Sequence, residues 1–440
     1  MRINIKNIVS TPVFTVLGGN AAASVLGLLI FALLGRYLSN AEFGIWVLFT
    51  TAISMADLIR SGLVKTSLIW SLASKEKEEW RPTVGAAWCL MLLVSLALAL
   101  SVATIQYLIP EWVDKLNLTL FFKFYPFYAI LSAPFYVVSW ILQAERRFAV
   151  SQIGRLLVNV SILLAFGIQY LYGFRVINFV GTFILSHGAI SFIYLTFFDS
   201  GFSSAFQTKI GEVRKLWNYG RNSLATLAGG SLLRGTDVYF IGAWLGPEAV
   251  AVYSIPMKII DFLDIPLRSI AIAEFSRLVG LWENRDRKKF GTKMYALIAA
   301  GLGISLVTVV PLLFVSDYIT AFFNIDNGEG RLLIMIFAVA MLLLPIEKFL
   351  GVGFDAIGRP DLNARKVWAM LTFNVLGDLL ALHYFHSIYL VAVVTIGVQL
   401  VGILYSSRFF DLNVGHFMKA LSGFYTLVRK KLLITTRPEI

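Results

Sequence analysis

The sequence predicts an all-α polytopic membrane protein with about 12 transmembrane helices in two six-helix lobes. Three observations predict this fold class: an apolar composition, long continuous apolar segments, and Lys and Arg concentrated on alternate loops. Of the 440 residues, 58% are hydrophobic and 15% are charged, and the mean hydropathy is +0.76. Soluble domains are about 45–50% apolar and about 25% charged. We therefore expect lipid, not water, to surround most of the chain.

The apolar segments are long enough to cross a hydrocarbon core of about 30 Å as helices. They are continuous, not alternating, and each is about twice as long as a barrel strand, which favours helices over strands. The eighth is the least clear, because it carries several charges. The segments fall at 12–34, 43–62, 85–108, 120–142, 151–172, 177–198, 220–244, 249–271, 293–315, 331–353, 365–384 and 388–407.

Basic residues indicate the orientation of these segments. If the N-terminus lies inside, the inner segments carry thirty Lys and Arg and the outer segments carry five, with three more inside spans. Cytoplasmic loops are enriched in Lys and Arg. The sequence therefore predicts that both termini are cytoplasmic, and this bias accounts for the net charge of +12 without a nucleic-acid partner. The first apolar run, Val13–Leu34, lacks an A-x-A cleavage pattern, which argues against a cleavable signal peptide.

Four parts of the chain follow from this organisation. We expect an N-terminal lobe at 1–200, a cytoplasmic amphipathic linker at 201–219, a C-terminal lobe at 220–407 and a basic interfacial cytoplasmic tail at 408–440. Apolar stripes beside basic residues predict that the linker and the tail lie on the membrane surface, and the alternative is a solvated linker and tail. The stripes are Phe206, Ile210, Val213 and Trp217 in the linker, and Phe417, Leu421, Phe424, Val428 and Leu432 in the tail.

The two halves of the chain resemble each other. Residues 35–46 (GRYLSNAEFGIW) and 242–253 (GAWLGPEAVAVY) form equivalent outer hairpins at an offset of 207, and 144–147 and 356–359 fall in equivalent inner loops at an offset of 212. A repeat of six spans gives both halves the same orientation. We therefore expect two lobes related by an axis along the membrane normal, as in transporters with parallel repeats.

Three segments resemble Wzx-type polysaccharide-biosynthesis transporters, the O-antigen and capsule flippases of the MOP exporter superfamily. They are Leu34–Gly44 (LGRYLSNAEFG), Leu233–Gly246 (LRGTDVYFIGAWLG) and Ala251–Lys258 (AVYSIPMK). Length, span number and repeat extend the resemblance to the whole chain. It implies a cavity open alternately to each side of a bacterial cytoplasmic (inner) membrane. It also implies that the protein flips a polyprenyl-pyrophosphate-linked oligosaccharide for surface polysaccharide such as lipopolysaccharide O-antigen, with a polysaccharide polymerase as a further partner.

Ionisable residues inside membrane spans are costly unless they face water or each other. Two helices carry such residues at helical spacing: Arg234 and Asp237 on the seventh, and Lys258, Asp261, Asp264 and Arg268 on the eighth. We expect these faces to line the transport cavity, where the cations attract a pyrophosphate or an acidic sugar. The alternative is that the opposite charges neutralise each other so that the helices can insert.

Further candidates lie elsewhere. Asp57 and Arg60 end the second predicted span and serve either as an interfacial anchor or in coupling and cargo uptake. Asp378, with Asn374 one turn before it, is either a cation or proton site or a buried hydrogen-bonded pair. Glu347 and Lys348 are expected to pair with each other on the tenth span.

Absent motifs narrow the function classes. No G-x-x-x-x-G-K-[ST] occurs, so a P-loop ATPase is excluded, and His, Cys and carboxylates show no metal-ligand spacing. We expect neither catalytic residues nor cofactors. The alternatives to a flippase are a MATE-like drug or cation antiporter and, less favoured, a membrane glycosyltransferase or polymerase, for which we would expect a long outer loop with a reactive cluster.

Overall fold

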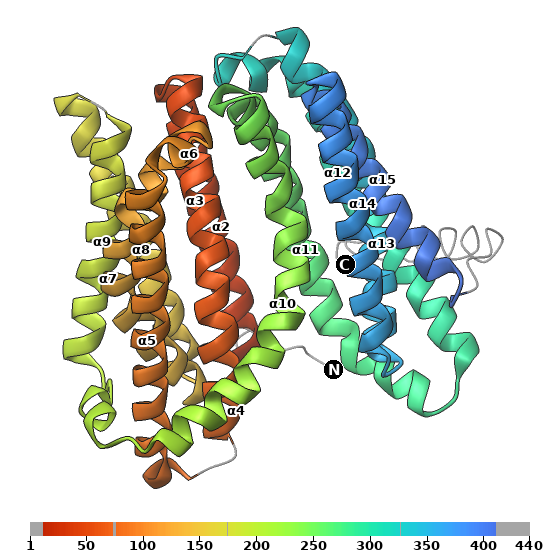
Figure 1. Cartoon of the computed structure of the whole chain (residues 1–440). Coiled ribbons are helices and arrows are strands. Elements are labelled where there is room, and N and C mark those ends of the chain that lie inside the picture. Colours follow the sequence, from red (N-terminus) through yellow and green to blue (C-terminus); the bar gives the residue numbers. More distant parts are fainter. Residues whose placement is uncertain (1–11, 74–75, 174, 326, 411–440) are drawn as a thin grey trace, which may run out of the picture. The chain divides into compact units, whose positions relative to one another are not determined.

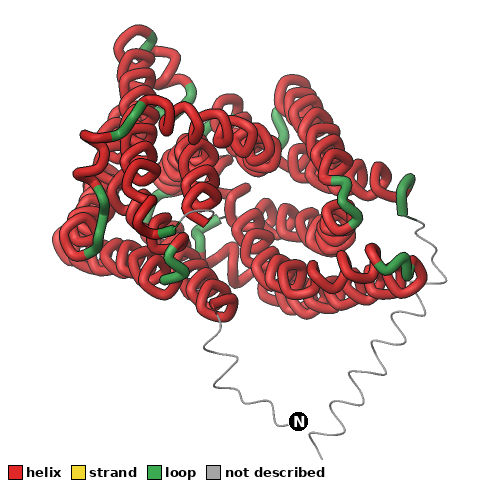
Figure 2. The backbone as a smooth tube through the Cα atoms, turned by 90° about the horizontal axis from the view of Figure 1, so that it is seen from below, coloured by secondary structure: helices red, strands yellow, loops and turns green. Residues whose placement is uncertain are grey.

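The computed structural model describes residues 12–73, 76–173, 175–325 and 327–410, and its regular elements in these ranges are all helical (Figures 1 and 2). This confirms the predicted fold class. The longer helices are α2 (Pro12–Tyr37), α3 (Asn40–Arg60), α4 (Thr66–Ala73), α5 (Trp80–Leu108), α7 (Thr119–Ala144), α8 (Phe148–Tyr172), α9 (Val176–Phe197), α10 (Ile210–Trp244), α11 (Pro247–Glu283), α12 (Arg287–Phe322), α13 (Asn327–Ala356), α14 (Pro360–Phe385) and α15 (Ile388–Ser407). Short elements are the π-helical turn η1 (Ser61–Lys65), the 3₁₀ turns η2 (Lys77–Glu79) and η3 (Phe202–Gln207), and α6 (Pro110–Lys115).

Ten helical segments among the described residues are long and apolar enough to cross a membrane. They coincide with the first six and the last four predicted spans. The seventh and eighth predicted spans correspond to α10 and α11, which have 35 and 37 residues and are long enough to cross as well. These two helices carry the charged residues singled out above, and those charges lower their mean hydropathy.

The second span is longer than predicted. Helix α3, the π-helical turn η1 and α4 form one apolar segment from Asn40 to Leu72, whereas the sequence predicted a span ending at 62. At Gly62 an added Cβ would lie 3.0 Å from the Cα of Leu224 in α10, so the glycine allows the two backbones to meet. Because the segment continues past Arg60, this arginine does not mark its end.

The chain divides into two compact units, one up to Ser254 and one from Ile255. Helix α10 packs against α3, η1, α4 and α5, so it belongs to the first unit. This boundary differs from the predicted lobe boundary at 200–220, which was placed from span counting. In the second unit, apolar side chains from α11, α12 and α13 form a core that includes Leu267, Ile298 and Phe349.

The predicted linker at 201–219 is largely helical, and its position at the membrane surface stays a prediction. It consists of η3 followed by the first turns of α10, which run without interruption into the seventh span. Phe206 and Ile210 are nonetheless 82% and 88% exposed, as an apolar surface stripe requires. The predicted tail at 408–440 lies outside the described residues from 411 onward.

Two pairs of turns support the internal repeat. After α7, Arg146 has φ 61°, and the N–H of Arg147 donates to the carbonyl of Leu142. The same pattern follows α13, 212 residues later: Gly358 has φ 75°, and the N–H of Arg359 donates to the carbonyl of Phe354. Asn117 and Asn324, 207 residues apart, have φ 56° and 55°. Both are followed by the same two hydrogen bonds back onto the preceding helix. A left-handed residue closed in this way is the Schellman helix end, so the two halves end equivalent helices alike.

Candidate transport site

Asp237 and Arg234 occupy different environments on α10. Asp237 is 5% exposed, and its carboxylate accepts a hydrogen bond from the Tyr253 hydroxyl on α11 at 2.6 Å. Arg234 is exposed, and its guanidinium donates to the Ser231 hydroxyl one turn earlier at 3.3 Å. The acid therefore lies inside the first unit, while the guanidinium lies at its surface.

Four charged residues of α11 form two separate groups. Lys258 and Asp261 make a loose pair at 3.7 Å, with side chains 39% and 54% exposed. Asp264 is largely buried; it accepts a 2.5 Å hydrogen bond from Arg268 Nε and a further bond from Lys348 on α13. The side chain of Arg268 is still 57% exposed. Residue spacing alone does not distinguish the two groups. Lys258 and Asp261 form an exposed pair, whereas Asp264 connects α11 to α13.

Glu347 and Lys348 do not pair with each other, so that prediction is wrong. Adjacent helical residues point in different directions, and each finds a partner on another helix. Lys348 bonds Asp264, and Glu347 accepts a 2.5 Å hydrogen bond from Lys366 on α14. The side chain of Lys366 is only 2% exposed. Together the two ion pairs connect α13 to α11 and α14.

Asn374 and Asp378 lie on one face of α14 and are 2% and 0% exposed. The Asn374 amide donates to Asp378 Oδ2 at 3.3 Å. The pair is therefore buried and hydrogen-bonded. Among the described residues, no group of three or more His, Cys, Asp or Glu side chains gathers in a way that could hold a metal ion.

Arg60 lies at the centre of a buried polar network in the first unit. It is 1% exposed, and all five of its N–H donors have acceptors. Nε donates to Asp57 Oδ1 at 3.0 Å, and Nη2 donates to the same oxygen and to Ser132 at 3.0 Å. Nη1 donates to the carbonyl of Ala129 at 2.7 Å and to Ser95 at 3.5 Å. An interfacial anchor would expose its guanidinium, so that interpretation of Arg60 is wrong.

The other oxygen of Asp57 faces two tyrosines of α7. The hydroxyls of Tyr128 and Tyr136 each donate to Asp57 Oδ2 at 2.8 Å. Beside them is a cavity of about 310 Å³. Its lining residues are Ser54, Asp57, Leu58, Arg60, Ser61, Tyr136 and Trp140. The Asp57 carboxylate and the Arg60 guanidinium therefore both line this cavity and both take part in the hydrogen-bond network.

Sequence reasoning missed the partners of this network. Tyr128, Ser132 and Tyr136 recur every four residues on α7, a spacing that places polar groups on one helical face and was available as a signal. His187 on α9 packs its ring against Tyr128 at 5.1 Å and bonds the carbonyl of Phe183 at 2.8 Å, so it closes the same polar cluster.

Comparison with protein families gives two matches. The family model described as "Polysaccharide biosynthesis protein" matches residues 11–273, which is more than half of the chain, and the MatE model matches residues 224–378. A curated relative, "Probable low-salt glycan biosynthesis flippase Agl15" of Haloferax volcanii, is 22% identical over 170 residues. That alignment covers 38% of this chain and 35% of the relative, so the chain spans about a third of the length of the relative it matches.

Solved structures share the fold. The lipid II flippase MurJ in an inward closed conformation has a TM-score of 0.71 at 15% identity, with 96% of this chain and 93% of that chain covered. An inward-facing multidrug resistance MATE family transporter of the MOP superfamily has a TM-score of 0.68 at 16% identity, with 94% and 95% covered. At such low identity the likeness establishes the fold and no more.

Proposed function

This chain belongs to the polysaccharide biosynthesis protein family, and from that premise we propose that it flips a polyprenyl-pyrophosphate-linked oligosaccharide across the membrane. It is a multi-pass membrane transporter of the MOP superfamily with a flippase-like fold. The proposal adds the cargo, the direction from the cytoplasmic to the outer leaflet, and a role in the assembly of surface polysaccharide such as O-antigen, capsule or exopolysaccharide.

The observation that carries the proposal is the exposure of cations on α10 and α11. Both helices are long enough to cross a membrane, but neither is among the ten candidate spans. Arg234 on α10 is exposed, and the side chains of Lys258 and Arg268 on α11 are 39% and 57% exposed. A cation within a span is costly against lipid and is tolerated beside a water-filled path. Guanidinium groups bind phosphate oxygens in a bidentate way, which suits a pyrophosphate cargo.

The proposed mechanism is alternating access. The pyrophosphate and sugars cross along the polar faces of α10 and α11, while the polyprenyl tail stays in lipid. Asp237 accepts a hydrogen bond from Tyr253, and Asp264 accepts one from Lys348. These contacts reduce the repulsion between the two carboxylates and an anionic cargo, so the acids mainly orient neighbouring groups. Asn374 and Asp378 are the proposed site of coupling to a cation or proton, and Asp57 contributes through its cavity.

The setting follows from the same family. We propose a bacterial cytoplasmic membrane with both termini cytoplasmic, as the Lys and Arg distribution predicts. The polysaccharide polymerase that consumes the flipped oligosaccharide is then a partner on the outer side.

A side-resolved assay tests the proposal. The protein is depleted in its host, polyprenyl-linked oligosaccharide is quantified on each membrane face, and wild type or Arg234→Ala is supplied. We expect build-up on the cytoplasmic face, rescue by wild type, and at least tenfold weaker rescue by Arg234→Ala, because one charge-assisted phosphate contact is lost. Arg331→Ala serves as the control, since Arg331 is an arginine of a predicted outer loop that pairs with Asp317 at 3.3 Å. Normal distribution of the lipid-linked sugar after depletion would contradict the proposal.

A drug or cation antiporter is the second candidate. The MatE match at 224–378 and the likeness to a multidrug transporter favour it. Such a protein would lower the accumulation of lipophilic cations in cells, and its loss would leave lipid-linked sugars unchanged. Both readouts can be taken from the same depleted strain.

A further inference from the structure

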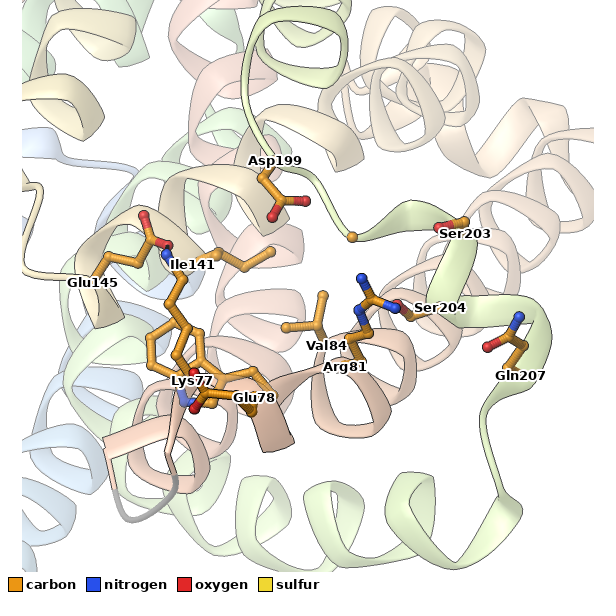
Figure 3. A pocket seen from close by; sticks show the side chains of 12 residues that line it. Lys77, Glu78, Arg81, Val84, Ile141, Glu145, Asp199, Ser203, Ser204 and Gln207 are labelled. Atoms are coloured by element: carbon orange, nitrogen blue, oxygen red, sulfur yellow. Dashed lines mark ion pairs between the residues drawn. The ribbon is translucent and has the colours of Figure 1, made fainter.

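A second cavity lies at one end of the first unit, where three membrane helices begin or end. It has a volume of about 400 Å³, within the usual range for small-molecule sites. Its walls come from η2 and the start of α5, the end of α7, and the segment after α9 that includes η3 (Figure 3). Lys77, Arg81, Glu145, Asp199 and Ser204 are among the lining residues.

The wall formed by residues 199–207 is fixed against α5. The indole of Trp88 donates to the carbonyl of Ser200 at 2.7 Å, and the thiol of Cys89 contacts the carbonyl of Ala205 at 3.4 Å. Gly201 has φ 57°, and a Cβ there would lie 2.7 Å from Val84. These contacts fix the cavity wall without a ligand, which lowers the conformational free-energy cost of binding.

Beyond the ion pairs of the described residues, one lining cation, Arg81, and two lining acids, Glu78 and Asp199, remain for a ligand. Glu145 is already paired with Lys77 at 2.7 Å and with Arg147 at 3.3 Å. Arg81 and Asp199 form no ion pair with any other residue that the structure describes. Figure 3 shows the Arg81 guanidinium and the Asp199 carboxylate on opposite sides of the same space, with Ser203, Ser204 and Gln207 beside Arg81.

The surroundings place this cavity at the membrane boundary. The helices α5, α7 and α9 are candidate spans, and the cavity lies at their ends. Phe197, Phe206 and Ile210 next to it are 78%, 82% and 88% exposed. Apolar side chains exposed beside a polar cavity at a helix end suit a ligand with a polar head and acyl chains.

We propose that this cavity binds the headgroup of a zwitterionic phospholipid with a primary ammonium, that is, a phosphoethanolamine lipid. The phosphate is held by Arg81 with the hydroxyls of Ser203 and Ser204, and the ammonium by Asp199. The acyl chains extend along Phe197 and Phe206. Arg234, Lys258 and Arg268 are not among its lining residues, so this proposal does not depend on the proposed cargo.

The charge balance selects among lipid classes. The cavity is lined by two cations, Lys77 and Arg81, and three acids, Glu78, Glu145 and Asp199. An anionic headgroup would pair with Arg81 but leave Glu78 and Asp199 without a cation. A choline headgroup keeps the positive charge but has no N–H to donate to Asp199. An ethanolamine headgroup satisfies both the cation and the acid.

Lipid retention measured by native mass spectrometry tests this site on the whole purified protein. Delipidated protein is titrated with ethanolamine, N-methylated, choline and glycerol phospholipids of identical acyl chains. We expect ethanolamine lipid to bind about tenfold more tightly than choline lipid, with the main loss at the last N-methylation, because that step removes the remaining N–H and its charged hydrogen bond. Arg81→Gln and Asp199→Asn should each remove this preference, while Arg81→Lys keeps part of it. Arg175→Gln, an exposed arginine at the start of α9, is the control.

Three results would each contradict the proposed lipid site. Equal retention of ethanolamine and choline lipids by wild type overturns it, and this comparison needs no variant to fold. Preference for anionic lipid, strengthened by Asp199→Asn, would indicate an anion site instead. Equal competition by soluble glycerophosphoethanolamine and by the intact lipid would show that the exposed aromatic rim contributes nothing, against a membrane lipid as the ligand.

Discussion

At the residue scale, Arg60 shows how a charge is accommodated inside a membrane helix. Its five N–H donors reach one carboxylate, two serines and a backbone carbonyl, and the guanidinium lies 5.1 Å from the ring of Tyr136. Burying an ion is costly unless its partners are complete. Because Asp57 comes from the same helix while Ser95, Ala129 and Ser132 come from α5 and α7, the network also fixes how three helices pack.

Removing Arg60 should therefore destabilise the protein strongly. Arg60→Gln leaves the partly buried Asp57 carboxylate with only the tyrosine donors, and the expected loss is about 3–5 kcal/mol. The double variant Asp57→Asn with Arg60→Gln should be more stable than Arg60→Gln alone, since no uncompensated charge remains. The measurement is the apparent thermal unfolding midpoint of detergent-solubilised protein. An Arg60→Gln midpoint equal to that of wild type would mean that the network contributes no stability.

At the element scale, the hairpins predicted to be outer in the two repeats share a sequence pattern and pack together in the first unit. The turn after α2 has a capping box, in which Ser39 and Glu42 bond each other's backbone N–H, whereas the turn after α10 uses Gly246 at φ 90° and Pro247. Asn117 donates to the carbonyl of Gly242 at 3.1 Å, so a third loop joins them. The equivalent positions Ser39 and Gly246 therefore begin the next helix with different backbone conformations, φ −62° and 90°.

Gly44 is the point where this packing is tightest. A Cβ on Gly44 of α3 would overlap the carbonyl oxygen of Pro247, whereas a Cβ on Gly27 of α2 would meet nothing within 4 Å. We expect Gly44→Ala to lower the yield of folded protein severalfold, because backbone atoms cannot move aside as a side chain can. Gly27→Ala should fold as well as wild type or slightly better, since Ala favours helix over Gly by about 1 kcal/mol. Gel filtration of the solubilised variants distinguishes the two, and equal yields would contradict the close approach.

At the scale of the whole molecule, helices α10 and α11 are long enough to cross a membrane but carry several charged residues. They are the two long helices of the described chain outside the ten candidate spans, and the MurJ and MATE structures that share the fold cover 96% and 94% of this chain. A transporter needs such helices, because a polar cargo cannot cross beside purely apolar surfaces.

The orientation of the bundle can be measured directly. In a Cys89→Ser background, we expect Lys115→Cys to react with a membrane-impermeant maleimide in intact cells. Asn284→Cys should react only after permeabilisation. Both positions are exposed at helix ends, and the Lys and Arg distribution places them on opposite sides. The reverse labelling pattern would show that the chain is inverted in the membrane.

The sequence by itself determined the fold class, the positions of ten spans apart from the end of the second, the repeat and the family. These properties depend on hydropathy, loop charge and local turn residues, which act over a few tens of residues at most. Only the tertiary structure decided which charges are satisfied. The prediction that Glu347 and Lys348 pair with each other was wrong. Arg60 proved to be buried, and the sequence did not predict the cavity at Arg81 and Asp199. Partners such as Asp264 and Lys348, or Arg60 and Ser132, lie on different helices, and spacing along one helix cannot predict which side chains a neighbouring helix brings to it.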